Sequence, residues 1–448
     1  MNRRDLITTA TAAGLAASLG SEAYAQTRRR PSTLRIGMIG VGMRGRVLLR
    51  ELVRREDVQV VALCDIDQFT LDRALEQFTE AAKRAPRLWT GDNEVWREML
   101  AAGGLDGVVI ATPWELHAPM TIAAMQARVP VACEVVAGVS LADHFAVLQA
   151  YNTTRTPYML LENVCFRRDV MAITTMVRQG VFGEMIHLEG GYQHDLRAVK
   201  FNAGVPDEAY GGGVEFGARG WSEARWRTQH SVDRNGDLYP SHGIGPCATW
   251  AGINRGNRFT HLTSYASKAR GLHNYVIAEA GADHPNARVN FRLGDVVQTM
   301  IACANGETIM LTHDTNLPRP YSLGFRVQGE KGVWMDLNKS IYIEGQSPEA
   351  HRWQEAQEWL DRYDHPLWRQ HADQAEGAGH GGMDFFVVHA WIEALKARAP
   401  MPIDIYDALA WSAITPLSEQ SIAAGNRTVE FPDFTDGGWR ERAPSTLP

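Results

Sequence analysis

The chain has 448 residues, of which 45% are hydrophobic and 22% are charged, and its formal net charge is −7. These fractions are typical of a soluble globular protein, and the length suggests about two to three domains. The negative charge gives no electrostatic reason to bind nucleic acid, so we expect a small or neutral partner. No stretch after residue 25 reaches the roughly 18 consecutive apolar residues that a membrane span requires.

The N-terminal segment has the pattern of an export signal. Arg3-Arg4 precedes a mildly apolar stretch from Leu6 to Leu19, and Ala23-Tyr24-Ala25 is typical of a cleavage site. The paired arginines indicate a twin-arginine-type signal peptide over residues 1–25, followed by a basic linker over residues 26–33. We therefore expect a periplasmic or secreted protein that is exported after it has folded.

Neither the cysteines nor the histidines predict a metal site. The cysteines are odd in number and widely scattered, which indicates buried small hydrophobic residues and no disulfide framework. They are Cys64, Cys133, Cys165, Cys247 and Cys303. Histidines near the C-terminal end fit no helical i, i+4 pair, so we expect no metal ion there. They are His365, His371, His380 and His389, and the stretch from His380 to Asp384 is a candidate border of the pocket with no assigned role.

A glycine-rich turn directly after a short buried strand predicts a dinucleotide-binding domain. The strand spans Leu34 to Ile39, and the turn carries Gly40, Gly42 and Gly45 in the GxGxxG spacing. The first glycine permits the tight turn, the second lets the backbone approach a pyrophosphate, and the third lets a helix over residues 46–54 pack on the strand. The helix N-terminus then faces the phosphates, where its free N–H groups favour anions.

An acidic residue after the second strand selects the cofactor. The strand Val58 to Leu63 is followed by Asp65, about twenty residues beyond the last glycine, where the ribose-binding carboxylate is expected. A carboxylate accepts a hydrogen bond from the ribose 2′-OH and repels a 2′-phosphate, so NAD is favoured over NADP.

Alternating helices and strands continue to residue 162. This pattern predicts a doubly wound parallel sheet over residues 34–162, which is the Rossmann arrangement. Ligands bind at the C-terminal ends of such strands, where Thr112 to His117 leave the central strand. The expected helices span 70–83, 94–101 and 120–127, and the expected strands span 107–111, 129–133 and 158–161.

Residues 163–440 are expected to form an α+β domain with a large, mostly antiparallel open sheet. Asn305-Gly306 is a strong hairpin signal between two strands, and Glu330-Lys331 lies between another pair. An open sheet face often pairs, which makes this sheet the candidate surface for a homo-oligomer. The expected strands span 185–191, 295–304, 307–314, 323–328 and 332–337, and the expected helices span 170–179, 383–397 and 404–424.

The NAD-binding half, followed by Thr112-Pro113 and His117 and then by Glu134, resembles the glucose-fructose oxidoreductase, inositol dehydrogenase and rhizopine-catabolism (Gfo/Idh/MocA) superfamily. Dehydrogenases of that superfamily usually place Glu-Lys-Pro after this strand, and the lysine helps to move the substrate hydroxyl proton. This chain has Glu134-Val135-Val136 instead. A valine cannot act as an acid or base, so ordinary sugar dehydrogenation is less expected.

Further along, the chain resembles one branch of that superfamily, the NAD-dependent α-N-acetylgalactosaminidases of glycoside hydrolase family 109. Two features depart from the branch: Val135-Val136-Ala137-Gly138, and a Gly-rich stretch from Ala203 to Trp221 that resembles an insertion at the mouth of the pocket. The matching blocks are Glu162 to Asp169, Gly191 to Arg197, Trp226 to Thr228 and Asn235 to Gly243.

The resemblance implies hydrolysis of terminal α-N-acetylgalactosaminides with retention, by transient oxidation at C3, C2 deprotonation, elimination and water addition. NAD is then recycled in every turnover, which suits an exported protein that carries its cofactor with it. Two other functions stay open: a periplasmic NAD(P)-dependent sugar oxidoreductase of the glucose-fructose type, and a sugar-binding protein that keeps NAD without catalysis.

The resemblance also implies the residues of the site. His242, Tyr239 and Tyr192 are the candidate catalytic residues, and His242 is preferred as the base because histidine titrates in the right range. The candidate substrate-binding residues are Tyr192, Arg227, Tyr239, Pro240, Ser241, His242 and Tyr321. The candidate cofactor-binding residues are Gly40, Gly42, Met43, Arg44, Gly45, Asp65, Trp114, Glu115, Leu116, His117, Glu134, Val135, Asn163 and Tyr239.

Overall fold

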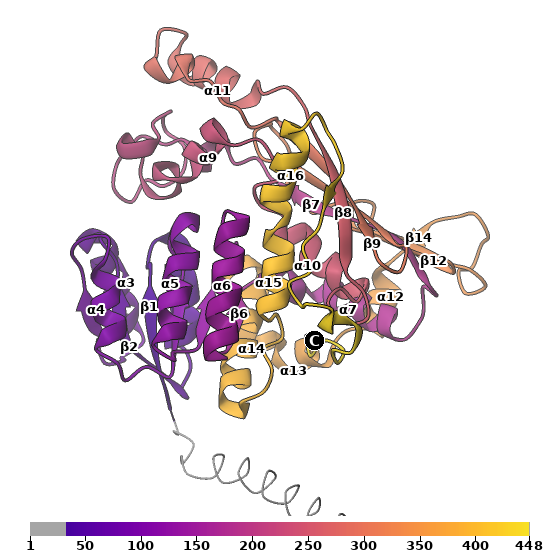
Figure 1. The fold of residues 1–448 in the computed structure, drawn as a ribbon, viewed down its shortest axis with the longest axis horizontal. Helices are drawn as coiled ribbons and strands as arrows, with labels where there is room; N and C mark the ends of the chain where they lie inside the picture. The colour runs from indigo at the N-terminus through magenta and orange to yellow at the C-terminus, as the bar shows by residue number, and fades with distance from the viewer. Residues whose placement is uncertain (1–32, 448) are drawn as a thin grey trace, which may run out of the picture.

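The computed structural model describes residues 33–447 and consists of two β-sheets with helices packed on them (Figure 1). The predicted signal peptide and nearly all of the predicted linker lie outside the described residues. Within residues 33–447, no helix is long and apolar enough to cross a membrane. The cysteines at positions 64, 133, 165, 247 and 303 are buried and free, as expected for small hydrophobic residues.

The first sheet is parallel, with strand order β3-β2-β1-β4-β5-β6, which confirms the Rossmann arrangement. Helices connect successive strands and cover both faces, so the strands read as continuous apolar runs. The strands are β1 (Leu34–Ile39), β2 (Val58–Cys64), β3 (Arg87–Trp89), β4 (Gly107–Ile110), β5 (Val131–Cys133) and β6 (Tyr158–Leu160). The helices are α2 (Met43–Val53), α3 (Gln68–Glu80), α4 (Val95–Ala101), α5 (Trp114–Gln126) and α6 (Leu141–Thr154).

Two helices of this domain differ from the expectation. Helix α5 begins at Trp114 and contains Pro119, whereas we expected it to begin only after that proline. A proline removes one backbone hydrogen bond, but burial of Trp114 and His117 on the helix stabilises the turns before it. Helix α6 was not predicted, although Ser140 and Asp143 form a capping box at its start.

The second sheet has strand order β14-β13-β12-β11-β7-β10-β9-β8-β15 and is antiparallel except between β7 and β10. Both predicted hairpins are confirmed: β9 pairs with β10 across Asn305-Gly306, and β11 pairs with β12. Gly306 has φ +105°, the region that favours glycine. The strands are β7 (Met185–Gln193), β8 (Phe259–Ala266), β9 (Val296–Cys303), β10 (Thr308–Asp314), β11 (Arg326–Gly329), β12 (Gly332–Met335), β13 (Ser340–Ile343), β14 (Gln354–Glu355) and β15 (Val429–Glu430).

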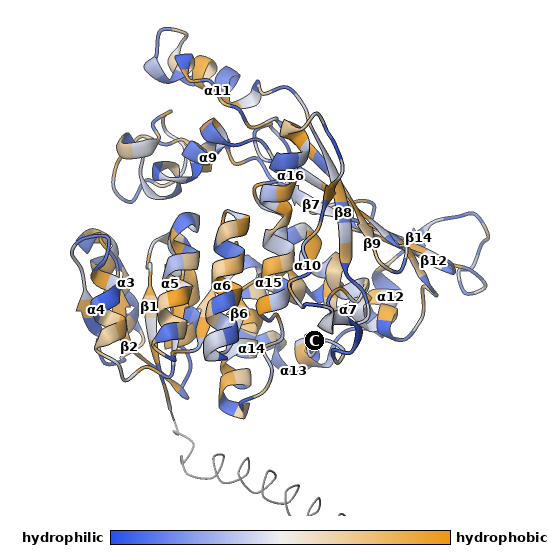
Figure 2. Ribbon diagram, viewed as in Figure 1, coloured by the Kyte–Doolittle hydropathy of each residue, from blue (hydrophilic) through white to orange (hydrophobic). Residues whose placement is uncertain are grey.

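Helices of the C-terminal half pack on one face of this sheet, and one of them, α14, also packs against α2 of the Rossmann domain. In Figure 2 hydrophobic residues recur along α10 and β8, which belong to one core that continues into the Rossmann domain. Trp391 of α14 lies against Gly107 of β4, where any side chain would collide with its ring. The helices are α7 (Arg168–Arg178), α8 (Arg197–Lys200), α9 (Arg227–Asp233), α10 (Ser241–Trp250), α11 (Gly271–Ala280), α12 (Gln357–Arg362), α13 (Pro366–Ala375) and α14 (Met383–Ala397).

The expected single helix over residues 404–424 is wrong, because the structure has two helices there. They are α15 (Ile405–Ser412) and α16 (Ile414–Ala423). Pro416 lies in the first turn of α16, where it has no N–H to donate back to α15. The chain therefore starts a new helix, and α16 runs beside β8 (Figure 1).

Candidate active site

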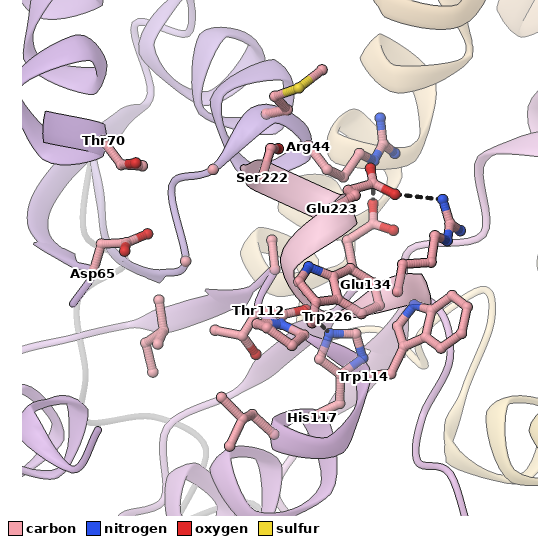
Figure 3. A pocket seen from close by; sticks show the side chains of 18 of the residues that line it. Arg44, Asp65, Thr70, Thr112, Trp114, His117, Glu134, Ser222, Glu223 and Trp226 are labelled. Atoms are coloured by element: carbon pink, nitrogen blue, oxygen red, sulfur yellow. Dashed lines mark hydrogen bonds and ion pairs between the residues drawn. The ribbon is translucent and has the colours of Figure 1, made fainter. Parts of the chain in front are cut away.

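A cavity of about 390 Å³ lies where the two domains meet. On one side it is lined by the C-terminal ends of β1, β2, β4 and β5, the edge at which doubly wound sheets bind ligands. On the other side it is lined by Tyr192 at the end of β7, by residues 221–227 and by Tyr239. Figure 3 shows Asp65 and Thr70 at one end of the cavity and Trp114, Glu134 and Glu223 toward the other.

The glycine turn has the shape that a dinucleotide pyrophosphate requires. Gly40 has φ +83°, and a Cβ there would lie 2.5 Å from the carbonyl oxygen of Ala111. A Cβ on Gly45 would overlap the carbonyl oxygen of Gly40, so only glycine lets α2 sit this close to β1. A Cβ on Gly42 would point into open space among the described residues, which leaves the backbone at the start of α2 accessible from the cavity. The turn therefore fits NAD.

Asp65 lies beside this turn. One carboxylate oxygen accepts a hydrogen bond from the backbone N–H of Val41 at 2.9 Å, and the other accepts from that of Asp67 at 3.1 Å. Burial raises the pKa of Asp65, which these backbone donors partly counteract. The carboxylate is thus fixed at the expected ribose position, and Thr70 and Asn93 line the same end of the cavity.

Arg44, in the first turn of α2, joins three segments that are distant in sequence. Its Nε donates to Glu134 at 2.6 Å (Figure 3). Its Nη1 lies 2.9 Å from Asp384. Asn163 and His380 also contact Asp384, at 2.8 Å and 2.7 Å. Burial alone would raise the pKa of Asp384, but Arg44 and His380 hold it well below its usual range. The network contains three predicted cofactor-binding residues, Arg44, Glu134 and Asn163. The other two members, His380 and Asp384, had no assigned role.

His117 connects the backbone segments that follow β4 and β5. Its Nδ1 lies 2.6 Å from the carbonyl oxygen of Val136, and its Nε2 lies 2.8 Å from that of Thr112. A ring with two carbonyl acceptors satisfies both only as the imidazolium, in which both nitrogens donate. Burial disfavours that charge, but Cys133 and the two carbonyls favour it and raise the pKa of His117 to about 9.

The three predicted catalytic side chains meet at one point. The ring centroids of Tyr192 and Tyr239 are 4.6 Å apart, and the His242 ring lies 5.2 Å from the first and 4.8 Å from the second. Tyr192 is the last residue but one of β7, and His242 lies in the first turn of α10. Gly191 and Gly243 permit this approach, because a Cβ on Gly243 would lie 2.6 Å from the Gly191 Cα.

Glu162 orients His242, and the sequence reasoning missed it. Its carboxylate is fully buried and lies 2.8 Å from His242 Nδ1. A second bond, from the backbone N–H of Val164 at 3.0 Å, fixes the carboxylate in place. When Nδ1 donates to Glu162, Nε2 is left with its lone pair and can accept a proton. The position of Glu162 in the sequence does indicate a place near the site. Glu162 follows β6 as Glu134 follows β5, and both strands end at the same edge of the sheet.

Burial makes the two tyrosines proton donors. It raises the pKa of Tyr192 to about 12 and that of Tyr239 well above its usual value, despite the nearby Arg227 charge. Both phenols are therefore protonated at neutral pH. The Tyr192 hydroxyl also lies 3.2 Å from His194 Nδ1. Of the three side chains, the imidazole of His242, held by Glu162, is the one that offers a lone pair to accept a proton.

Arg227 begins α9 and carries a buried positive charge into the cavity. It pairs with Glu223, and its guanidinium lies 5.0 Å from the Trp114 ring centroid and 5.1 Å from that of Tyr239. A fixed fork of donors framed by aromatic rings is suited to bind hydroxyl or amide oxygens.

Most predicted site residues line the cavity, and five do not. Glu115 points to His230 at 2.9 Å, and Tyr321 is 48% exposed with its ring centroid 4.9 Å from that of His194. Gly45, Pro240 and Ser241 lie behind the lining. The lining residues that were predicted are Gly40, Gly42, Met43, Arg44, Asp65, Trp114, Leu116, His117, Glu134, Val135, Asn163, Tyr192, Arg227, Tyr239 and His242. The individual roles of these residues stay predictions.

The histidines near the C-terminal end are dispersed. His380 lines the cavity, whereas His365 caps the start of α13. The ring centroids of His371 and His389 are 4.9 Å apart. Across residues 33–447, no group of three or more His, Cys, Asp or Glu side chains is placed to hold a metal ion.

The fold and the cavity define an NAD-binding protein of the Gfo/Idh/MocA superfamily. Residues 34–160 match the oxidoreductase family with an NAD-binding Rossmann fold. Levoglucosan dehydrogenase in complex with NADH and L-sorbose superposes with a TM-score of 0.64 at 19% identity, covering 90% of this chain and 100% of that one. Myo-inositol 2-dehydrogenase from Lactobacillus plantarum superposes with a TM-score of 0.59 at 15% identity, covering 89% and 100%. These two structural similarities support the fold alone.

Within that class, the chain belongs to glycosyl hydrolase family 109. Residues 166–441 match the C-terminal domain of this family. A glycosyl hydrolase family 109 protein of Stenotrophomonas maltophilia is 63% identical, covering 99% of this chain and 98% of that protein. A protein of Tannerella forsythia named alpha-N-acetylgalactosaminidase is 46% identical, with the same coverage. The family resemblance of the sequence is confirmed, and the chain is an NAD-binding enzyme of a glycosidase family.

Proposed function

We propose that the protein hydrolyses terminal α-N-acetylgalactosaminides with retention of configuration, using one NAD that stays bound and is regenerated in each turnover. The observation that carries this proposal is the Glu162–His242 pair, which places a base beside the phenols of Tyr192 and Tyr239. The same cavity contains the glycine turn that fits NAD. The name of the Tannerella forsythia relative supports the choice of sugar.

Different residues of the site carry out the proton transfers and bind the sugar. Bound NAD would supply reversible uptake of hydride from sugar C3, with the C3 hydroxyl proton released to solvent, and the resulting C3 ketone would acidify the C2 proton. His242 Nε2 removes that proton, while Glu162 stabilises the imidazolium that forms. Tyr192 or Tyr239 donates a proton to the departing oxygen at C1, and Arg227 holds a polar group of the sugar. Water then adds at C1 and gives a proton back to the tyrosinate, and His242 protonates C2 after its own proton has exchanged with solvent. Return of the hydride and a solvent proton to C3 completes the cycle, so the net reaction is hydrolysis.

A glucose-fructose type oxidoreductase is the less suitable assignment. Val135 occupies the position where related dehydrogenases usually have a catalytic lysine, so the chain departs from their set of residues, and its 63% and 46% identical relatives carry glycosidase names. Of the two buried carboxylates that follow β5 and β6, Glu134 is engaged by Arg44 and Glu162 by His242. The second of these pairs is suited to C2 deprotonation.

Release of p-nitrophenol from its α-N-acetylgalactosaminide, with purified protein and no added nucleotide, tests the proposal. We expect multiple turnovers per protein, with bound NAD recovered unchanged at the end. His242→Ala should lose this activity while it still contains NAD. Accumulation of NADH with another sugar, without any release of nitrophenol, would instead favour the oxidoreductase.

We further propose that the protein acts outside the cytoplasm, because residues 1–25 have the pattern of a twin-arginine signal. Export of a folded protein would carry the cofactor along. Fractionation of cells that express the full chain tests this: the protein should reach the periplasm, and replacing Arg3-Arg4 by two lysines should retain it in the cytoplasm.

The open face of the second sheet is our proposed surface for a homo-oligomer. Tyr265 on β8 is 62% exposed there, and Met300 on the adjacent strand β9 is 43% exposed. Light scattering should give a dimer or larger species for the native chain. Tyr265→Glu with Met300→Glu should shift it to a monomer with unchanged NAD content.

A further inference from the structure

One loop of the C-terminal domain reaches the Rossmann domain across the cavity. It comprises residues 203–221, between α8 and the short 3-10 helix Ser222–Arg225, and we call it the strap. Asn202 is fully buried and fastens both ends of the strap. Its Oδ1 accepts from the backbone N–H groups of Gly204 and Trp221, both at 3.0 Å, and its Nδ2 donates to the Trp221 carbonyl at 2.8 Å. A loop whose ends are tied to one residue can act as a single body.

The strap touches α3, a helix of the Rossmann domain, at two points. Trp221 packs edge-on against Phe69, with ring centroids 5.7 Å apart and an interplanar angle of 78°. Asp207 pairs with Arg73 at 2.9 Å, one helical turn farther along α3. The aromatic contact is the stronger of the two, because the ion pair is about half exposed and screened by salt.

These contacts close the cavity over the end that holds Asp65. Trp221 and Ser222 line it from the strap side, and Asp65, Ile66 and Thr70 line it from the Rossmann side. Figure 3 shows Ser222 on the segment that crosses the cavity between Thr70 and Glu134. A dinucleotide bound along the glycine turn, with its ribose at Asp65, would lie beneath this segment, and its adenosine half would leave only if the strap separated from α3.

We propose that the strap is a cofactor-retaining element, in which Trp221 and the Asp207–Arg73 pair hold NAD in the protein between turnovers. Hydrolysis without net redox change has no need for cofactor exchange. A contact that slows NAD release therefore costs such an enzyme nothing, whereas a dehydrogenase that exchanges NADH would be slowed by it. The inference concerns NAD release and does not depend on which sugar is hydrolysed.

The test measures NAD release directly, without any glycoside. Holoenzyme freed of unbound nucleotide is diluted into alcohol dehydrogenase and ethanol, which convert each released NAD into fluorescent NADH. We expect Trp221→Ala to release NAD about fivefold faster or more, and Arg73→Ala about two- to fivefold faster. Combining Arg73→Ala with Asp207→Asn should add nothing to Arg73→Ala alone, because both remove the same pair.

Lys83→Ala is the matched control, since Lys83 forms a largely solvent-exposed ion pair with Glu56 at 2.9 Å on the same domain, just beyond the C-terminal end of α3. Its release rate should equal that of the native protein. Thermal unfolding at saturating NAD checks that each variant is folded, and Arg73→Ala keeps the test valid if Trp221→Ala does not fold. Unchanged NAD release in a folded Arg73→Ala, and in Trp221→Ala where it folds, would overturn the proposal, even if the glycosidase activity is as proposed.

Discussion

Replacing Glu162 by Gln changes one atom of the carboxylate that holds His242, so it probes the base without altering the shape of the site. The backbone N–H of Val164 requires an acceptor and lies 3.0 Å from one Glu162 oxygen. The glutamine carbonyl is therefore held there, and its NH₂ group points at His242 Nδ1, 2.8 Å away in the native protein. A donor at that position forces Nδ1 to accept and places the proton on Nε2. His242 then cannot take a proton from the substrate.

The expected loss follows from that tautomer change. General base catalysis contributes about 10²–10⁴-fold to a rate, and Glu162→Gln should remove most of it from kcat. The assay is p-nitrophenol release at saturating substrate, with bound NAD quantified in the same sample. KM and NAD content should stay close to native, because Glu162 does not line the cavity. Native kcat in a Glu162→Gln protein with full NAD content would refute the assignment of His242 as the base.

The remaining predictions concern the glycine turn, His117 and Arg227. Gly45→Ala should abolish NAD binding, because its Cβ would overlap the Gly40 carbonyl, whereas Gly42→Ala should fold and weaken binding only by crowding the cofactor, as measured by calorimetry. The pKa of His117 is raised to about 9, above its unfolded value, so its stabilisation is complete below about pH 6.5 and lost as pH rises through 9. Urea unfolding should show this decline, of about 3 kcal/mol, and a His117→Gln protein should lack it. Arg227→Lys should lower kcat/KM by about tenfold or more, because lysine keeps the charge but loses the fork of donors; native kinetics would exclude a bidentate role.

Local signals in the sequence predict the elements that hold the cofactor. The strand, glycine spacing and acid of a Rossmann domain depend on residues close together in the chain, and Gly40, Gly45 and Asp65 lie as expected. The Asn305-Gly306 hairpin is equally local. The helix predicted over residues 120–127 begins at Trp114 in the structure, because burial of Trp114 and His117 outweighs the hydrogen bond lost at Pro119.

Contacts between distant segments could not be predicted in the same way. Glu162 and His242 are separated by 80 residues, and nothing local to either indicates the other. Arg44 meets Asp384 only because α14 returns from the second domain to α2. The strap is a similar case: its glycines mark a loop, but its docking on Phe69 depends on how the two domains pack. Such pairings follow from tertiary packing, which single-sequence patterns do not encode.

The proposed chemistry requires that the C2 proton of the sugar is removed and replaced during hydrolysis. Turnover of the p-nitrophenyl α-N-acetylgalactosaminide in heavy water, followed by mass spectrometry and NMR of the released sugar, measures this directly. The proposed mechanism predicts one deuterium at C2 in an initially α-configured product, with no net NADH. A product that retains its original C2 proton would show that the bond is cleaved without C2 deprotonation, and would contradict the proposed roles of His242 and NAD.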